Sequence, residues 1–242
     1  MTQILRWAAP HRTWIVRHRL LRSVVLRILT LHRDGSETVV HLGHARGLRW
    51  RRSKRNGVAE YWLGTFEPVV QQSIVEGLSP GETFFDVGSH SGFHSLLGAR
   101  AVGPEGLVVA IEPDPANAAE TEGQAALNGF GHITVVRKAA VAELSEPSSR
   151  VPDAAVTSTT IDHLSHEFRP PSLIKIDVEG LELEVLRGAA ATLREHRPTL
   201  VIEAHSEALA GITTARLGAL GFHCESSPAP YGPEYHIVAK PE

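Results

Sequence analysis

The chain has 242 residues, of which 42% are hydrophobic and 21% charged, enough for one substantial α/β domain and too apolar for a wholly disordered chain. Its single cysteine, Cys224, excludes an intramolecular disulfide and a cysteine-based zinc site, and it indicates a reducing compartment such as the cytoplasm. The net charge of −3 is unevenly divided, because residues 1–60 carry 13 basic and three acidic residues whereas the remainder carries 11 and 24.

The first part of the chain predicts an extension over residues 1–58, ahead of a domain at 59–242. Residues 3–33 show the spacing of a basic amphipathic helix, and arginines interrupt its apolar residues too often for a signal peptide or a spanning helix. Such a helix either caps the domain or pairs with a second copy in a homodimer, which we favour, or it lies peripherally on a membrane. Residues 38–42 and 47–50 predict an antiparallel hairpin, and residues 69–78 a helix.

From residue 83 onward, apolar runs alternate with helical patterns. This alternation predicts a Rossmann-like α/β fold, with a mostly parallel sheet covered by helices on both faces. The expected strands are 84–87, 107–112, 133–136, 173–178, 200–204, 222–225 and 235–239, and the expected helices are 92–102, 116–127, 182–195 and 207–220.

The loop after the first of these strands is the first candidate for a binding site. Gly88 and Gly92 frame a turn into a helix, and Glu112 follows Gly92 by 20 residues, the spacing of an acid that accepts from ribose hydroxyls. A third glycine of the dinucleotide motif is missing, and Asp86 places a carboxylate beside the loop, where it would repel a pyrophosphate. A ligand with an ammonium group and no phosphate, such as S-adenosylmethionine (SAM), therefore suits this loop better than NAD.

A second group of polar residues follows two later strands. Lys175 lies within an apolar strand that ends in Asp177, and Glu203 and His205 end the next strand two residues apart, so they face the same side. Asp177 or His205 can serve as a base for a hydroxyl to be methylated. Together with Glu203 they could instead hold a divalent metal, the less favoured alternative, so that no metal is expected.

Three weaker candidates remain. Asn128 either contacts the ligand or caps the preceding helix. The stretch around Ala139 follows the third strand, where it could flank an adenine. His90 and His94 have helical spacing, but no third zinc ligand accompanies them.

Taken together, these segments resemble the FkbM family of SAM-dependent methyltransferases. The resemblance covers about residues 60–205 and runs through LGTFEP (63–68), FDVGSHSG (85–92), IEPDP (111–115), TTID (159–162), IKIDVEG (174–180), VLRGA (185–189), RP (197–198) and IEAH (202–205). It implies a class I methyltransferase fold with seven strands, the last antiparallel, and methyl transfer to a hydroxyl of a sugar, lipid or secondary metabolite. The family often has alanine and asparagine where this chain has Ser89 and His90.

The resemblance also implies roles for individual residues. Asp86, Gly88, Ser89 and Gly92 would hold the methionine part of SAM, Glu112 the ribose, and Glu67 would meet the ammonium group. Asp177 would lie nearest the methyl group, with Lys175, Glu179 and His205 beside it. Asp162 is expected to be structural.

Other functions stay open at this stage. They are an NAD-dependent oxidoreductase, an RNA methyltransferase using the basic extension, and a non-catalytic SAM-binding protein. Contact with nucleic acid is the less favoured use of the basic run at 51–56, because no aromatic residues are interleaved with it.

Overall fold

The computed structural model describes residues 34–55, 58–143, 157–229 and 232–242. The helix expected at residues 3–33, with its alternative roles, lies outside these ranges. Among the described residues, no helix is both long and apolar enough to cross a membrane.

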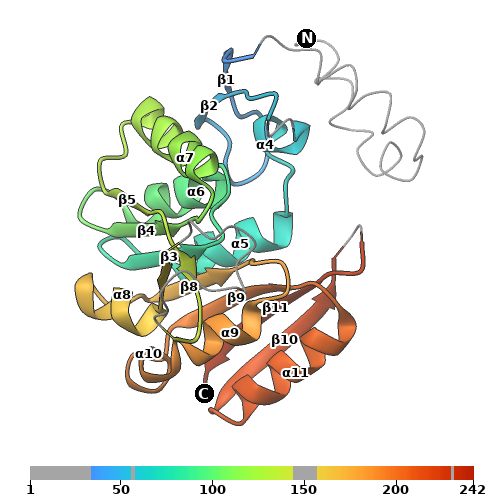
Figure 1. The fold of residues 1–242 in the computed structure, drawn as a ribbon. Helices are drawn as coiled ribbons and strands as arrows, with labels where there is room; N and C mark the ends of the chain where they lie inside the picture. The colour runs from blue at the N-terminus through green and yellow to red at the C-terminus, as the bar shows by residue number, and fades with distance from the viewer. Residues whose placement is uncertain (1–33, 56–57, 144–156, 230–231) are drawn as a thin grey trace.

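A seven-stranded sheet forms the centre of the molecule, in the order β10-β11-β9-β8-β3-β4-β5 (Figure 1). β11 alone runs antiparallel to both of its neighbours, and the other pairings are parallel. The expected fold class is therefore confirmed. The strands are β3 (Thr83–Val87), β4 (Leu107–Ile111), β5 (Ile133–Val136), β8 (Leu173–Ile176), β9 (Thr199–Ala204), β10 (Phe222–Pro228) and β11 (Tyr235–Pro241).

Alternate residues of the strands enter two separate cores, because successive side chains of a strand point to opposite faces. On β3, Phe84 belongs to the core beneath α5 (Pro68–Gly77) and α6 (Phe93–Val102), and Phe85 to the opposite core. That opposite core is covered by α8 (Ile161–Glu167), α9 (Glu182–Arg187), α10 (Ala190–Glu195) and α11 (Glu207–Gly218).

The N-terminal hairpin is present as β1 (Glu37–Val39) and β2 (Arg49–Arg51), which pair antiparallel. Trp50 of β2 is buried in the same core as Phe84 and packs against Tyr61 and Phe93. In the basic run after it, the exposed Arg51 and Arg55 pair with Glu37 and Asp114. The division of the chain at residue 58 stays a prediction.

One predicted helix is two helices in the structure. Residues 182–195 form α9 and α10, with a break at Gly188, whose carbonyl accepts from the Asp162 N–H group at 2.9 Å. The Asp162 carboxylate accepts the N–H groups of Ala191 and Thr192 in the first turn of α10. Satisfying these otherwise unpaired donors is a structural role, as expected for Asp162.

Four further elements were not expected from the sequence. The aromatic stretch after residue 58 contains the short helix α4 (Ala59–Leu63), residues 161–167 form α8, and β6 (Ala139–Ala140) pairs with β7 (Ser158–Thr159) in a small second sheet. Elements this short give little periodic signal in a sequence.

Candidate active site

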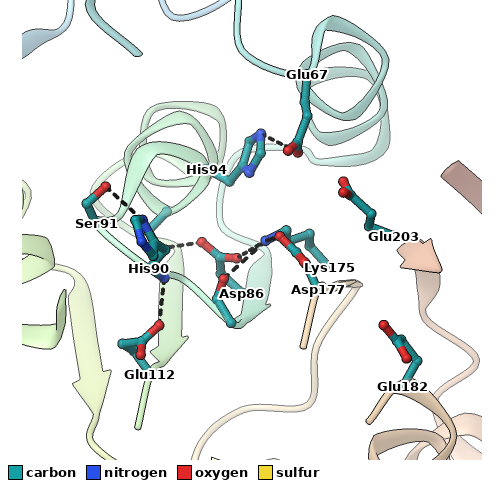
Figure 2. Close-up of polar contacts among 12 residues, drawn as sticks. Glu67, Asp86, His90, Ser91, His94, Glu112, Lys175, Asp177, Glu182 and Glu203 are labelled. Atoms are coloured by element: carbon teal, nitrogen blue, oxygen red, sulfur yellow. Dashed lines mark hydrogen bonds and ion pairs between the residues drawn. The ribbon is translucent and has the colours of Figure 1, made fainter. Parts of the chain in front are cut away.

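The polar residues singled out in the sequence meet at the carboxyl ends of β3, β8 and β9. These strands are neighbours in the sheet, so Asp86, Asp177 and Glu203 are brought to one edge, with Lys175 between them (Figure 2). In open α/β sheets, ligands bind outside this edge. The fold therefore brings these residues together, as expected.

The loop from Gly88 to Gly92 requires both of its glycines. A Cβ atom at Gly88 would lie 1.8 Å from the carbonyl oxygen of Asp177, and one at Gly92 would lie 2.8 Å from the Thr121 side chain. Both residues also have positive φ angles, which only glycine adopts without cost. Backbone packing at this loop thus leaves no room for other residues.

His90, the residue in which this loop departs from the family's usual pattern, has a positive φ of 49°. Asparagine and histidine tolerate this left-handed conformation better than most residues, which accounts for either at this position. The His90 N–H donates to Glu112 Oε2 at 2.8 Å, and the His90 carbonyl accepts from the Thr121 hydroxyl at 2.9 Å. His90 is thus part of the loop's framework through its backbone.

The Glu112 carboxylate hydrogen-bonds the backbone of two turns and can still accept from a ligand. Its other oxygen, Oε1, accepts from the Asp114 N–H at 2.9 Å, and burial raises the pKa of the Glu112 carboxyl against these hydrogen bonds, which lower it. A carboxylate offers about four acceptor positions. The Asn117 side chain also hydrogen-bonds this carboxylate, so about one acceptor position remains for a ribose hydroxyl.

Lys175 occupies the centre of the cluster. Its Nζ lies 3.1 Å from Asp177 Oδ2, 3.2 Å from the Gly88 carbonyl and 3.6 Å from Asp86 Oδ1. Burial by itself lowers the pKa of Lys175, but the charges of Asp177, Asp86 and Glu67 outweigh it and raise that pKa above the ordinary value. Lys175 therefore remains a cation and cannot act as a base.

Asp86 is fully buried and faces inward. Its Oδ2 accepts from the Ser95 hydroxyl at 2.6 Å, and burial raises its pKa against the opposing effects of Lys175 and Ser95. Asp86 thus stands behind the loop, holding Lys175 and the start of α6.

Glu67 enters the cluster from the start of α5. Its φ of 39° is in the left-handed region, and its carboxylate lies 3.7 Å from His94 Nε2. Burial raises the pKa of Glu67 well above its usual range, and Glu203 and Asp177 add to this against Lys175. Burial likewise lowers the pKa of His94 well below its usual value, so His94 is neutral.

Asp177 and His205 are more exposed than Glu67, Asp86, Lys175 and Glu203 in the same cluster. His205 Nε2 lies 3.7 Å from Asp177 Oδ1, and their side chains are 27% and 25% exposed. On the other side of the ring, Nδ1 lies 2.7 Å from Oε1 of Glu182, a fully buried residue. Burial lowers the pKa of His205, but its hydrogen bond to Glu182 and the nearby carboxylates raise it more.

Two participants were missed in the sequence. Glu182 is 23 residues from His205, and His236 of β11 lies 3.3 Å from Glu203 across the strand pairing. The acidic start of a helix after IKIDVEG was a signal for Glu182, since N-terminal acids often point back along the strand ends. His236 had no such signal.

One predicted contact is placed differently. Asn128 ends α7 (Pro115–Asn128), and its side-chain amide exchanges two hydrogen bonds of 2.8 Å with the backbone of Arg49. Because α7 is about 20 Å long, Asn128 is far from Glu112 and braces the hairpin instead. Ala139 follows β5 and is buried in β6, and its contact with the adenine stays a prediction.

Backbone strain concentrates at this edge. Within the described ranges, four non-glycine residues have positive φ, and three of them are Glu67, His90 and Glu179. Strained residues of this kind cluster at ligand sites, where the surrounding structure imposes them. All three lie on loops that border the cluster.

Comparison with known proteins identifies the family of this chain. The Methyltransferase FkbM domain model matches residues 86–223, more than half of the chain. The chain belongs to the FkbM methyltransferase family. It is a SAM-dependent methyltransferase. No curated protein matches the chain.

Solved structures share the fold at low identity. The FkbM methyltransferase of Methylobacillus flagellatus superposes with a TM-score of 0.55 at 20% identity, over 91% of this chain and 59% of that one. An rRNA methylase from Streptococcus thermophilus gives 0.52 at 12% identity, over 72% and 95%. Aeropyrum pernix fibrillarin, solved with natively bound SAM, gives 0.50 at 14% identity, over 67% and 68%.

Proposed function

We propose that this FkbM methyltransferase transfers a methyl group to a hydroxyl of a sugar, lipid or secondary metabolite. One observation carries the proposal. His205 and Asp177 present partly exposed proton acceptors, and His205 is held in place by the buried Glu182. A hydroxyl must lose its proton as it becomes methylated, and a histidine or carboxylate within reach supplies that function.

The cofactor side of the site fits SAM. The Ser89 hydroxyl and Glu67 Oε2 are buried polar atoms without hydrogen-bond partners in the described structure. In our proposal these two face the methionine part, Glu112 accepts from the ribose, and the Gly88–Gly92 loop lies against the ligand. Ala139 would flank the adenine.

SAM supplies an electrophilic methyl group on a sulfonium centre. The chain's own residues do the rest. Asp177 and His205 position the acceptor and take its proton, and Lys175 holds Asp177 in place by a hydrogen bond of 3.1 Å. Correct positioning of two reactants can itself supply much of the rate enhancement.

Labelled SAM incubated with the protein and with extracts of sugars, lipids and secondary metabolites tests this proposal. We expect labelled products that carry the methyl group on oxygen, identified by NMR. His205→Gln should lower kcat while leaving SAM affinity unchanged. Label found on nitrogen or carbon would contradict the proposal.

RNA is a less favoured acceptor, although one structural neighbour is an rRNA methylase. At such low identity that likeness concerns the fold alone. Arg49, Arg51 and Arg55 pair with acidic side chains of the same chain, so they offer little free positive charge for phosphates. Methylation of added RNA, weakened steeply by salt, would reverse this preference.

A further inference from the structure

Three side chains at the ends of β8 and β9 form a set of metal-binding type. Asp177, Glu203 and His205 each offer one ligand atom, and these atoms all lie within 4.8 Å of one another. A divalent cation bound at about 2.0–2.6 Å from each ligand separates its ligands by about 3–5 Å. The three atoms therefore surround a position of the right size.

The second atom of two of these groups is already engaged. Lys175 donates to Asp177 Oδ2, which leaves Oδ1 facing His205 Nε2 at 3.7 Å. Glu182 Oε1 lies 2.7 Å from His205 Nδ1. Because an ionised carboxylate can only accept, Nδ1 carries a hydrogen, and in the neutral ring, the form that binds a metal, Nε2 then has the lone pair.

The contact between Glu182 and His205 is an independent sign of a metal ligand. Histidines that bind metals almost always donate their other ring N–H to a carboxylate, a carbonyl or water, which fixes the tautomer. Glu182 has no exposed surface, and its Oε2 has no hydrogen-bond partner among the described residues. The same Oε1 also accepts from the Gly180 N–H at 3.0 Å, so this buried carboxylate holds both that turn and the His205 ring, whose side chain is 27% exposed.

The charge around this position also favours a cation. The carboxylates of Asp177, Glu182 and Glu203 lie around one part of the sheet edge (Figure 2). Lys175 Nζ lies 3.1 Å from Asp177 but is shared with Asp86. Glu203 Oε2 has no hydrogen bond, although His236 Nε2 is 3.3 Å away. Carboxylates this close repel one another unless a positive charge lies among them.

We propose that Asp177, Glu203 and His205 bind one divalent cation of the Mg²⁺ or Mn²⁺ class. Two carboxylates and one imidazole are a hard-to-borderline ligand set. The partial exposure of Asp177 and His205 leaves coordination positions open toward the acceptor side. Binding of the cation does not depend on the proposed function. The role of the cation in the reaction, however, rests on the proposed function.

In that role, the cation contacts the acceptor oxygen and lowers the pKa of the hydroxyl. With Nε2 of His205 bound to the cation, the acceptor's proton passes to solvent water, and this route replaces the proton transfer to Asp177 or His205 described for the proposed function. Asp177 and Glu203 then act as ligands, and Glu182 acts as the positioning residue for His205.

Titration of the chelator-treated full chain with Mn²⁺, followed by the EPR signal of free Mn²⁺, tests the site. We expect one bound ion per chain, displaced by Mg²⁺. Glu203→Gln should weaken binding at least about tenfold, and Glu182→Gln about 10- to 100-fold through loss of ligand orientation. Glu225→Gln, at an exposed acid on β10, is the matched control and should bind Mn²⁺ like wild type.

Each result bears on one claim. Circular dichroism and SAM calorimetry on Glu203→Gln confirm that the variant is folded. If wild type binds Mn²⁺ no more tightly than folded Glu203→Gln, the site is refuted, whatever the acceptor is. If Mn²⁺ binds but EDTA leaves methyl transfer unchanged, the catalytic role is refuted and the site stands. Methylation of nitrogen or carbon would refute the proposed function, but it would not change the conclusion from the Mn²⁺ titration.

Discussion

Lys175 Nζ lies 3.6 Å from Oδ1 of Asp86, and their side chains are 5% and 0% exposed. One residue was expected to act in catalysis and the other in binding the cofactor. In the structure they hold each other, so the buried charges at the centre of the sheet edge are paired before any ligand arrives. This pairing has a measurable consequence.

Lys175→Met should lower the free energy of unfolding by about 3–5 kcal/mol, because it leaves the buried Asp86 without its cation. Adding Asp86→Asn to Lys175→Met should recover part of that loss, since the unpaired charge is then removed. Urea denaturation of the two single variants and the double variant gives the coupling energy. Additive effects of the two substitutions would show that the pair is not coupled.

Glu112→Gln should weaken SAM binding about 10- to 100-fold. The carboxylate accepts from the N–H groups of His90 and Asp114, whereas glutamine has one acceptor oxygen for these donors and the ribose. Calorimetry with SAM measures the change. Glu122→Gln, at an exposed acid paired with Arg137, is the control, and equal affinities of the two variants would remove Glu112 from the SAM site.

Gly88→Ala should damage both stability and SAM binding, because its Cβ would lie 1.8 Å from the Asp177 carbonyl oxygen. Gly81 provides a matched control, since its φ is also positive at 87° but a Cβ there meets nothing within 4 Å. We expect Gly81→Ala to cost about 1–2 kcal/mol of conformational strain and to leave SAM affinity intact. Denaturation curves and calorimetry separate the two effects. Equal losses in both variants would mean that the close approach is unimportant.

The lowered pKa of His94 predicts how the free energy of unfolding depends on pH. Its pKa is far lower in the folded protein than in the unfolded chain, because burial disfavours the charged ring. Below about pH 6.5 the unfolded chain therefore binds a proton that the folded protein does not, and stability falls by about 1.4 kcal/mol per pH unit from this residue.

Urea denaturation between pH 7 and pH 5 checks this dependence. Glu67 titrates in the opposite sense, since its pKa is raised in the folded protein. The informative quantity is therefore the difference between wild type and His94→Gln, which should lose the destabilisation on acidification. His163→Gln, at an exposed histidine, should keep the wild-type slope. A His94→Gln curve parallel to wild type would contradict the assignment.

Much of the fold and half of the site could be predicted from local sequence. Apolar runs such as the one before Asp86, and glycines at Gly88 and Gly92, specify strands and a tight turn through interactions a few residues apart. Parallel strands then place their carboxyl ends at one edge, so Glu112 and Asp177 could be assigned to the site without coordinates.

The remaining features depended on contacts between distant segments. Nothing local to Glu182 or His205 shows that they touch, because their meeting depends on how α9 packs against the end of β9. Asn128 carries the same amide whether it meets a ligand or the backbone of Arg49, and only the position of β2 beside α7 decides between them. The sequence by itself determined which strands end in acids. The tertiary structure decided which of those acids face each other, because the packing of distant segments sets their burial and the distances to their partners. Burial and those distances in turn set their charges.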